Sequence, residues 1–181
     1  MREDYDIVEP LPADAEEMGR LHVRVWKEAY AGLMPADYLR SLDPMDRVRM
    51  WDARLTGDAA RRATGEAAGD EVTTHPRSRV ARHRATGSLV GIASAGPARD
   101  PDPVLPAELW MINVDSSHRG SGVADLLVEA TLGEAPGYLW VLAGNGRAQA
   151  FYRRLGFVDD GYTKVHPPTG TVELRMVRYG G

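Results

Sequence analysis

Apolar residues along this chain recur with two spacings, which separate predicted helices from predicted strands. A first helix follows Asp14, which forms a predicted capping box with Glu17. Residues three or four apart mark the buried face of that helix: Met18, Leu21, His22, Val25 and Ala29. Residues 35–42 and 45–55 predict two more helices, and residues 56–74, rich in Ala, Gly and charge, predict a mobile loop.

Short apolar runs predict the strands. They cover residues 5–8, 79–84, 88–95, 108–114, 139–142, 157–163 and 172–177. Thr86 and Gly87 mark the turn of a hairpin between the second and third of these strands. The last strand alternates apolar and charged positions, which is typical of a half-buried strand. Its alternating positions are Val172, Glu173, Leu174, Arg175 and Met176.

Two further helices each follow one of the short buried strands. Apolar residues with helical spacing form one face of each helix. They are Val123, Leu126, Leu127 and Ala130 in the first helix, and Ala148, Phe151, Tyr152 and Leu155 in the second. Asn145 is a good N-cap for the second helix, and Gly156 is a good residue to end it.

Length and composition limit the classes of protein that fit the sequence. With 181 residues, of which 43% are hydrophobic, the chain is long enough for one domain with a substantial core. No apolar run approaches the roughly 20 residues that span a bilayer, so no membrane partner is expected. The acidic start MREDYDIVEP lacks the apolar core of a signal peptide, so we expect a cytoplasmic protein.

Charge and residue types exclude further kinds of site. The chain has no cysteine, which excludes disulfides, thiolate zinc sites and a cysteine nucleophile. Its five histidines show no metal-ligand spacing, so no metal is expected. A net charge of −4 argues against a nucleic-acid partner and permits a cationic substrate. Lysine occurs only at Lys27 and Lys164, and such arginine-rich usage is typical of a GC-rich bacterial genome.

A glycine-rich segment, VDSSHRGSGVA, lies between the strand at residues 108–114 and the helix after it. Free N–H groups at the start of a helix, together with the helix dipole, attract phosphate, and Gly120 and Gly122 let the backbone approach such a ligand closely. A dinucleotide pattern fails because Asp125 occupies its third glycine position. A P-loop fails because no Lys followed by Ser or Thr comes after the last glycine. An ordinary glycine-rich turn into a helix is the alternative.

Two motifs lie in the order, and at about the distance, found in one enzyme family. Residues 119–124 carry the pattern R-x-x-G-x-A after a strand that ends in Val114, and residues 145–157 carry N-x-x-A-x-x-F-Y-x-x-x-G-F. Both motifs resemble those of the GCN5-related N-acetyltransferase (GNAT) family, in which the first motif is the acyl-CoA loop. Residues 26–43 resemble the helix–loop–helix that covers the acceptor side in one branch of the family. Where the family often has Pro, this chain has Ser116, a departure that affects the turn and not the chemistry.

The resemblance implies a fold and a reaction. The implied fold is α/β, a mixed, mostly antiparallel central sheet flanked by helices, in a single domain over residues 1–181. The implied reaction is transfer of an acetyl group from acetyl-CoA, the co-substrate, to a primary amine, without a metal. The amides of Ile112 and Val114 would pair with the pantetheine arm of the co-substrate. The full set of implied cofactor-binding residues is Ile112, Asn113, Val114, Arg119, Gly120, Ser121, Gly122, Val123, Ala124 and Asn145.

The resemblance also implies catalytic residues. Tyr152 is the candidate general acid, because a phenol with a pKa of about 10 is protonated at neutral pH. Glu108 is the candidate general base, acting through water, and Glu28 is its rival. Each of these residues has a purely structural alternative: a core tyrosine, a glutamate at a strand edge or a solvated helical charge. His118 is predicted to be an exposed loop residue rather than catalytic.

The acceptor and its pocket are left open. Trp26, Tyr30 and Trp110 are candidates for lining the acceptor pocket, with a core position favoured for Trp26. The acceptor is either a small-molecule amine or a protein or peptide, modified at its N-terminal amine or at a lysine. A non-catalytic CoA-binding regulatory module is the third alternative, and Tyr152 favours the enzyme. A homodimer is also left open.

Overall fold

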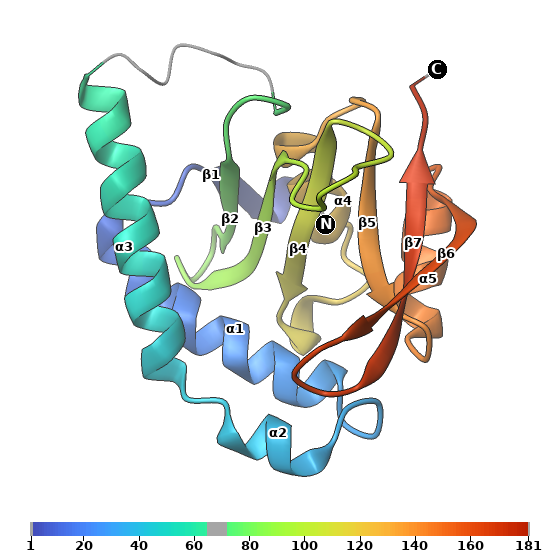
Figure 1. Cartoon of the computed structure of the whole chain (residues 1–181). Coiled ribbons are helices and arrows are strands. Elements are labelled where there is room, and N and C mark those ends of the chain that lie inside the picture. The colour runs from blue at the N-terminus through green and yellow to red at the C-terminus, as the bar shows by residue number, and fades with distance from the viewer. Residues whose placement is uncertain (1, 65–71, 181) are drawn as a thin grey trace.

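A seven-stranded sheet organises the protein, whose computed structural model describes residues 2–64 and 72–180 (Figure 1). The strand order is β1-β2-β3-β4-β5-β7-β6. All neighbouring strands are antiparallel except β4 and β5, which are parallel. The predicted mixed, mostly antiparallel sheet flanked by helices is therefore confirmed.

The strands are β1 Tyr5–Val8, β2 Arg77–His83, β3 Leu89–Pro97, β4 Ala107–Val114, β5 Gly137–Leu142, β6 Val158–His166 and β7 Thr171–Arg178. The helices are α1 Ala15–Ala29, α2 Ala36–Ser41, α3 Pro44–Ala63, α4 Val123–Thr131 and α5 Gly146–Arg154. Three short 3₁₀ segments are η1 Arg2–Asp4, η2 Pro12–Asp14 and η3 Ser116–His118.

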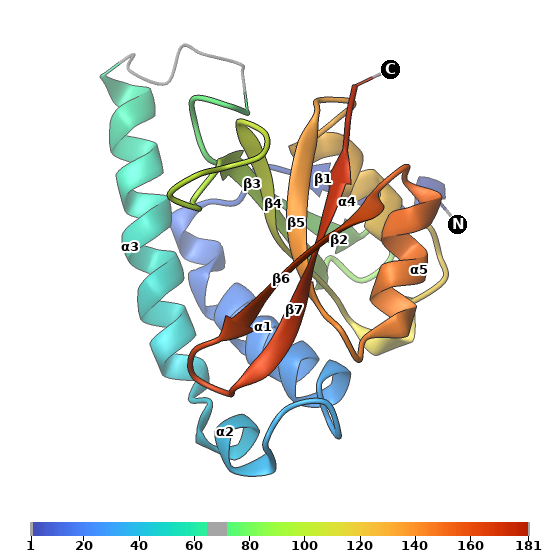
Figure 2. The same cartoon turned by 45° about the vertical axis from the view of Figure 1, so that its right-hand side comes forward.

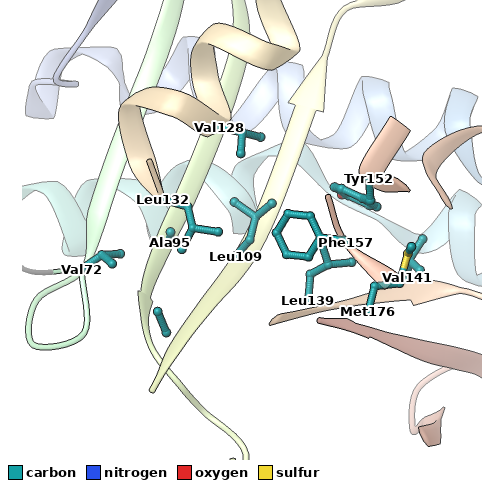
Figure 3. Packing of buried hydrophobic residues seen from close by; sticks show 11 residues of the cluster. Val72, Ala95, Leu109, Val128, Leu132, Leu139, Val141, Tyr152, Phe157 and Met176 are labelled. Atoms are coloured by element: carbon teal, nitrogen blue, oxygen red, sulfur yellow. The ribbon is translucent and has the colours of Figure 1, made fainter. Parts of the chain in front are cut away.

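The helices form a layer on each face of the sheet (Figures 1 and 2). On one face, α1 and α3 pack on β2 and β3 through a cluster that includes Met18, Trp51 and Ile92. On the other face, α4 and α5 pack on the central strands. That second cluster contains Val128, Leu139 and Phe157 (Figure 3). Burial of these apolar side chains supplies most of the driving force for the fold.

A β-bulge in β4 decides which face each of its residues meets. Ser94 of β3 pairs with Met111, and Ala95 pairs with Leu109, so Trp110 is an extra residue without a partner on β3. A bulge bends the strand and shifts its alternation. Leu109 consequently packs in the α4–α5 cluster, whereas Met111, two residues later, packs against the α1–α3 cluster.

Strands β4 and β5 separate along their length. Among the described residues, Glu108 and Tyr138 are their single register pair, and both lie near the beginnings of their strands. Figure 1 shows the two strands diverging toward their carboxyl ends. The edge of β4 near Val114 therefore has no strand beside it on the β5 side.

Three local predictions need correction, and the first concerns the loop expected at residues 56–74. The third helix continues through Ala63, so the first half of that stretch is helical. Its alanines and arginines favour helix, and Asp58 pairs with Arg61 one turn later. Residues 65–71 of the expected loop lie outside the described residues.

The second correction concerns the capping box at the start of α1. Asp14 occupies the N-cap position of that helix, but its side chain makes no capping hydrogen bond, because the carboxylate accepts from the Leu11 amide and pairs with Arg82. Glu17 accepts a hydrogen bond from the Leu89 amide and also meets Arg82. Both carboxylates therefore join α1 to the sheet.

The third correction concerns the alternation in β7. Val172 is exposed and Arg175 is buried, against the predicted alternation, whereas Met176 is buried as predicted. Burial of Arg175 is tolerated because its guanidinium pairs with Asp160 at 2.7 Å and stacks over Tyr162.

Candidate active site

The gap between β4 and β5 opens into a pocket of about 420 Å³. Its walls come from the end of α1, the end of β4, the loop after β4, the middle of β5 and α5. The predicted residues Ile112, Asn113, Val114, Arg119, Gly120, Gly122, Ala124, Asn145 and Tyr152 all line it. The structure therefore brings most of the residues predicted from the two motifs together.

The loop after β4 has the backbone geometry expected of a phosphate cradle. Gly120 and Gly122 have φ values of 77° and 88°, in the left-handed region that disfavours side chains. Gly122 is the N-cap of α4, so the first amides of that helix face the pocket end. A Cβ atom at Gly120 would meet nothing within 4 Å, which leaves space for a ligand above the loop.

Two predicted residues of this loop do not line the pocket with their side chains. Val123 is fully buried in the core. The Ser121 hydroxyl donates to the His118 carbonyl at 2.7 Å and accepts from the Val123 amide. Ser121 and Val123 therefore shape the loop, and any contact with a ligand would come from their amides.

Positive charge surrounds the cradle. Arg119, Arg147 and Arg154 line the pocket, and the Arg2 side chain lies next to Gly122. Burial and the nearby Arg119 lower the pKa of Arg147 below the usual arginine value. Asp125 also lines the pocket and pairs with Arg154 at 2.6 Å, so the arginines leave the wall with a net positive charge that attracts phosphate groups.

Asn113 and Asn145 contribute buried amides to the pocket. Asn145 caps α5, because its Oδ1 accepts a hydrogen bond from the Ala148 amide at 3.1 Å. Asn113 is only 4% exposed, and its Nδ2 has no hydrogen-bond partner within the described parts of the chain. An unpaired buried donor is costly, so Asn113 is suited to donate to a bound ligand.

Tyr152 packs in the core and also reaches the pocket, so its position is compatible with both alternatives considered from the sequence. Its ring packs in the α4–α5 cluster, at 6.0 Å from the Phe157 ring, beside Val141 (Figure 3). It also lines the pocket and is 8% exposed. Burial, helped by the nearby Tyr30, raises the pKa of Tyr152 above the usual tyrosine value, so the phenol stays protonated.

Only one of the three aromatic candidates lines the pocket. Tyr30, at the end of α1, is on the pocket wall. Trp26 packs with the apolar cluster of α1, α2 and β5, as favoured from the sequence. The Trp110 ring lies between the Arg54 and Arg99 guanidinium groups, and its Nε1 donates to the Pro97 carbonyl.

The two predicted bases occupy different environments. Glu108 is 2% exposed and is outside the pocket wall, with both carboxylate oxygens bound by Arg99 at 2.5 and 3.1 Å. Glu28 lies 3.7 Å from Arg119 and is partly exposed. His118 is half-buried rather than exposed, since it meets the Tyr5 hydroxyl through Nδ1, and it reaches the pocket wall.

Glu173 is a carboxylate that the sequence pattern assigned to the solvent side of a strand. It pairs in register with Leu142, which packs against Met34 and Leu39 beneath the first helices. Directly opposed residues share a face, so Glu173 points toward the α1–α2 side. Burial raises the pKa of Tyr30 above the usual tyrosine value, and the negative charge of Glu173 raises it further. No ion pair holds Glu173 in the described parts of the chain.

This geometry defines a class of protein: an acetyltransferase fold, with an opened sheet and a glycine-rich loop leading into a helix. The chain belongs to the acetyltransferase (GNAT) family, whose model matches residues 37–157. Membership of this family supports acetyl transfer from acetyl-CoA as the activity of the chain. Among curated proteins, no sequence matches it.

Solved structures show the same fold. A PaiA N-acetyltransferase from Thermoplasma acidophilum, in complex with coenzyme A, is 15% identical over 97% of this chain and 99% of its own, with a TM-score of 0.67. A histone acetyltransferase HPA2 and related acetyltransferase from Corynebacterium glutamicum is 25% identical over 98% and 97%, with a TM-score of 0.62. A ribosomal-protein-S5-alanine acetyltransferase from Vibrio fischeri is 14% identical over 98% and 93%, with a TM-score of 0.64.

Residues 2–64 and 72–180 contain neither a membrane-spanning helix nor a metal-binding group. No helix there has the length and apolar character to cross a membrane. No group of three or more His, Asp or Glu side chains there is arranged to hold a metal ion.

Proposed function

We propose that this protein transfers the acetyl group of acetyl-CoA to the primary amine of a small molecule. The observation that carries the proposal is the pocket itself, whose wall combines the glycine-rich loop with a protonated, buried Tyr152. The carrier's phosphates would bind the amides and arginines at residues 119–124. Its pantetheine arm would then run along the free edge of β4, with Asn113 and Asn145 as polar partners.

The proposed reaction requires two proton movements. The amine nitrogen attacks the thioester carbon, the C–S bond breaks, and the amine loses a proton while the sulfur gains one. Tyr152 would donate toward the departing sulfur. A thiol has a pKa near about 8.5, below that of a buried phenol, so donation must be coupled to return of a proton from the attacking amine.

The proton of the amine needs an acceptor, and two carboxylates are candidates. Glu108 is the residue suggested by the resemblance, but Arg99 engages its carboxylate and it is outside the pocket wall. Glu173 is also outside the pocket wall, but no cation pairs with it within residues 2–64 and 72–180, and it faces the α1–α2 side near Tyr30. These contacts favour Glu173 as the base, with Glu108 as the alternative.

Calorimetric titration with acetyl-CoA and CoA tests the binding half of this proposal. At a ligand concentration 100-fold above Kd, acetyl-CoA should raise the free energy of unfolding by about 2.7 kcal/mol. Absence of binding would contradict the proposal.

A panel of amines and peptides tests the transfer half of the proposal, with release of free CoA as the measure of turnover. Turnover of peptides alone would favour a protein acceptor, and tight binding without any turnover would favour a regulatory module.

A further inference from the structure

Lys164 of β6 does not line the pocket itself, but it packs against Trp140, which does. Its Nζ lies 3.9 Å from the centre of the Trp140 ring and 3.4 Å from Asp100 Oδ1. The Trp140 Nε1 donates to the other oxygen of the same carboxylate at 2.8 Å. One indole face and one carboxylate thus hold a primary ammonium, a pairing that suits cation binding in general.

The Trp140 ring links this ammonium to the pocket wall. Trp140 lines the pocket together with Tyr30 and Tyr152, whereas the cradle is formed by residues 119–124. A carrier whose phosphates occupy the cradle would direct its acyl end toward Trp140. The ammonium of Lys164 therefore packs on an aromatic ring that the acyl group would approach.

A proton acceptor stands directly opposite this lysine. Lys164 pairs in register with Glu173, and opposed residues of antiparallel strands share a face. The lysine ammonium turns to Asp100 instead, which leaves Glu173 without an ion-pair partner among residues 2–64 and 72–180. The Lys164 side chain is 39% exposed and flexible, so it can leave Asp100 without repacking the core.

We propose that Lys164 is an acceptor of this enzyme's own reaction, so that the chain acetylates itself at Lys164. This inference rests on the proposed function. The deprotonated Nζ attacks the thioester carbon, a C–N bond forms and the C–S bond breaks. Glu173 takes the proton that the ammonium gives up before the attack. The proton that Nζ loses as the C–N bond forms replaces the one that Tyr152 donates to the sulfur, so CoA leaves as the thiol. The acetylated side chain is neutral, so Asp100 and the Trp140 face lose the charge that occupied them.

The chain contains its own control for this proposal, because its other lysine, Lys27, is exposed on α1. The protein is incubated with acetyl-CoA, and acetylation at both lysines is followed by peptide mass spectrometry. Lys164 should be modified at least about 10-fold faster than Lys27, since an amine held beside the thioester reacts as a unimolecular partner. The rate should not change with protein concentration.

Two variants separate enzymatic from chemical acetylation. Tyr152→Phe should slow modification of Lys164 and leave that of Lys27 unchanged. Lys164→Arg keeps a cation over Trp140 and should bind acetyl-CoA as the parent does, without the fast modification. Fast labelling of Lys164 that persists in Tyr152→Phe would contradict the enzymatic step.

The remaining outcomes are also decisive. If calorimetry shows that acetyl-CoA binds but Lys164 reacts no faster than Lys27, self-acetylation is overturned and the proposed function stands. A rate that rises in proportion to protein concentration would overturn transfer within one chain. If acetyl-CoA does not bind, the proposed function fails first, and this inference fails with it.

Discussion

The Arg24 guanidinium donates a hydrogen bond to the Asp115 carboxylate across 2.7 Å, which joins α1 to the turn that precedes the phosphate cradle. The same carboxylate accepts from the Ser117 amide at 3.0 Å and from its hydroxyl at 2.6 Å. A single side chain therefore fixes both the start of the loop and its distance from the first helix.

Asp115→Asn should loosen this turn, lower the free energy of unfolding by about 1 kcal/mol and weaken acetyl-CoA binding. The Ser117 hydroxyl is the main cause that lowers the pKa of Asp115 from 3.8 to about 2. A lowered carboxyl pKa contributes stability above pH 3.8 that is lost as the pH falls through about 2. Urea unfolding of the parent and the variant at neutral and acid pH measures this contribution to the free energy of unfolding. Asp46→Asn, at an exposed pair on α3, is the control and should change neither property.

Gly122→Val should abolish acetyl-CoA binding, because the new side chain stands where the phosphate would meet the amides. The positive φ adds strain of about 1–2 kcal/mol. Gly87, with φ 72° in the β2–β3 turn and nothing within 4 Å, supplies a control with the same strain away from the pocket. Calorimetry should show binding by Gly87→Val and none by Gly122→Val. Equal affinity in both variants would refute the cradle.

Tyr152→Phe should lower kcat by about 10- to 1,000-fold while acetyl-CoA affinity holds. In the proposed mechanism the hydroxyl donates its proton as the C–S bond breaks, whereas the ring continues to pack against Phe157 in the variant. Steady-state kinetics with an acceptor found in the panel measure this change. An unchanged kcat, with the chemical step shown to be rate-limiting, would remove Tyr152 from the mechanism.

Glu173→Gln and Glu108→Gln together identify the base. Glu173→Gln should lower kcat by about 100-fold and remove the acidic limb of the pH profile of kcat/KM. Glu108→Gln should lower the melting temperature, because Arg99 loses its buried partner, and should keep that limb. The reverse pattern in the two pH profiles would assign the base to Glu108.

His22→Phe should reduce the loss of stability in mild acid. Burial lowers the pKa of His22 from 6.5 to about 3, with a smaller contribution from Arg47, and neither ring nitrogen has a partner in the described structure. The unfolded chain takes up a proton below pH 6.5 that the folded chain refuses, so stability falls as the pH drops from 6.5 toward 3. Between pH 7 and pH 5 this amounts to about 2 kcal/mol. Denaturant unfolding at both pH values should show a difference smaller by that amount in the variant.

Local sequence determined the parts of the site that depend on backbone geometry. The left-handed conformation at Gly122 and the cap at Asn145 each follow from a residue type and its neighbours, so short motifs revealed them. Strand pairing and contacts between distant segments determined the surroundings of the two carboxylates. Glu173 reaches the α1–α2 side only because β7 pairs with β5 in one register. Glu108 looked accessible at a strand edge, yet Arg99, from the loop before β4, binds it. The sequence pattern contains no signal for either long-range partner.

The unpaired edge of β4 has a consequence for how the molecule is held together. Strands β1 to β4 and strands β5 to β7 form two half-sheets, joined near Glu108 and Tyr138 and apart near Val114. A pantetheine arm hydrogen-bonded along that edge would act as a temporary eighth strand. Amide hydrogens of Ile112 and Val114 should then exchange slowly in the bound state, and the two halves of the sheet should unfold with greater cooperativity when the co-substrate is present.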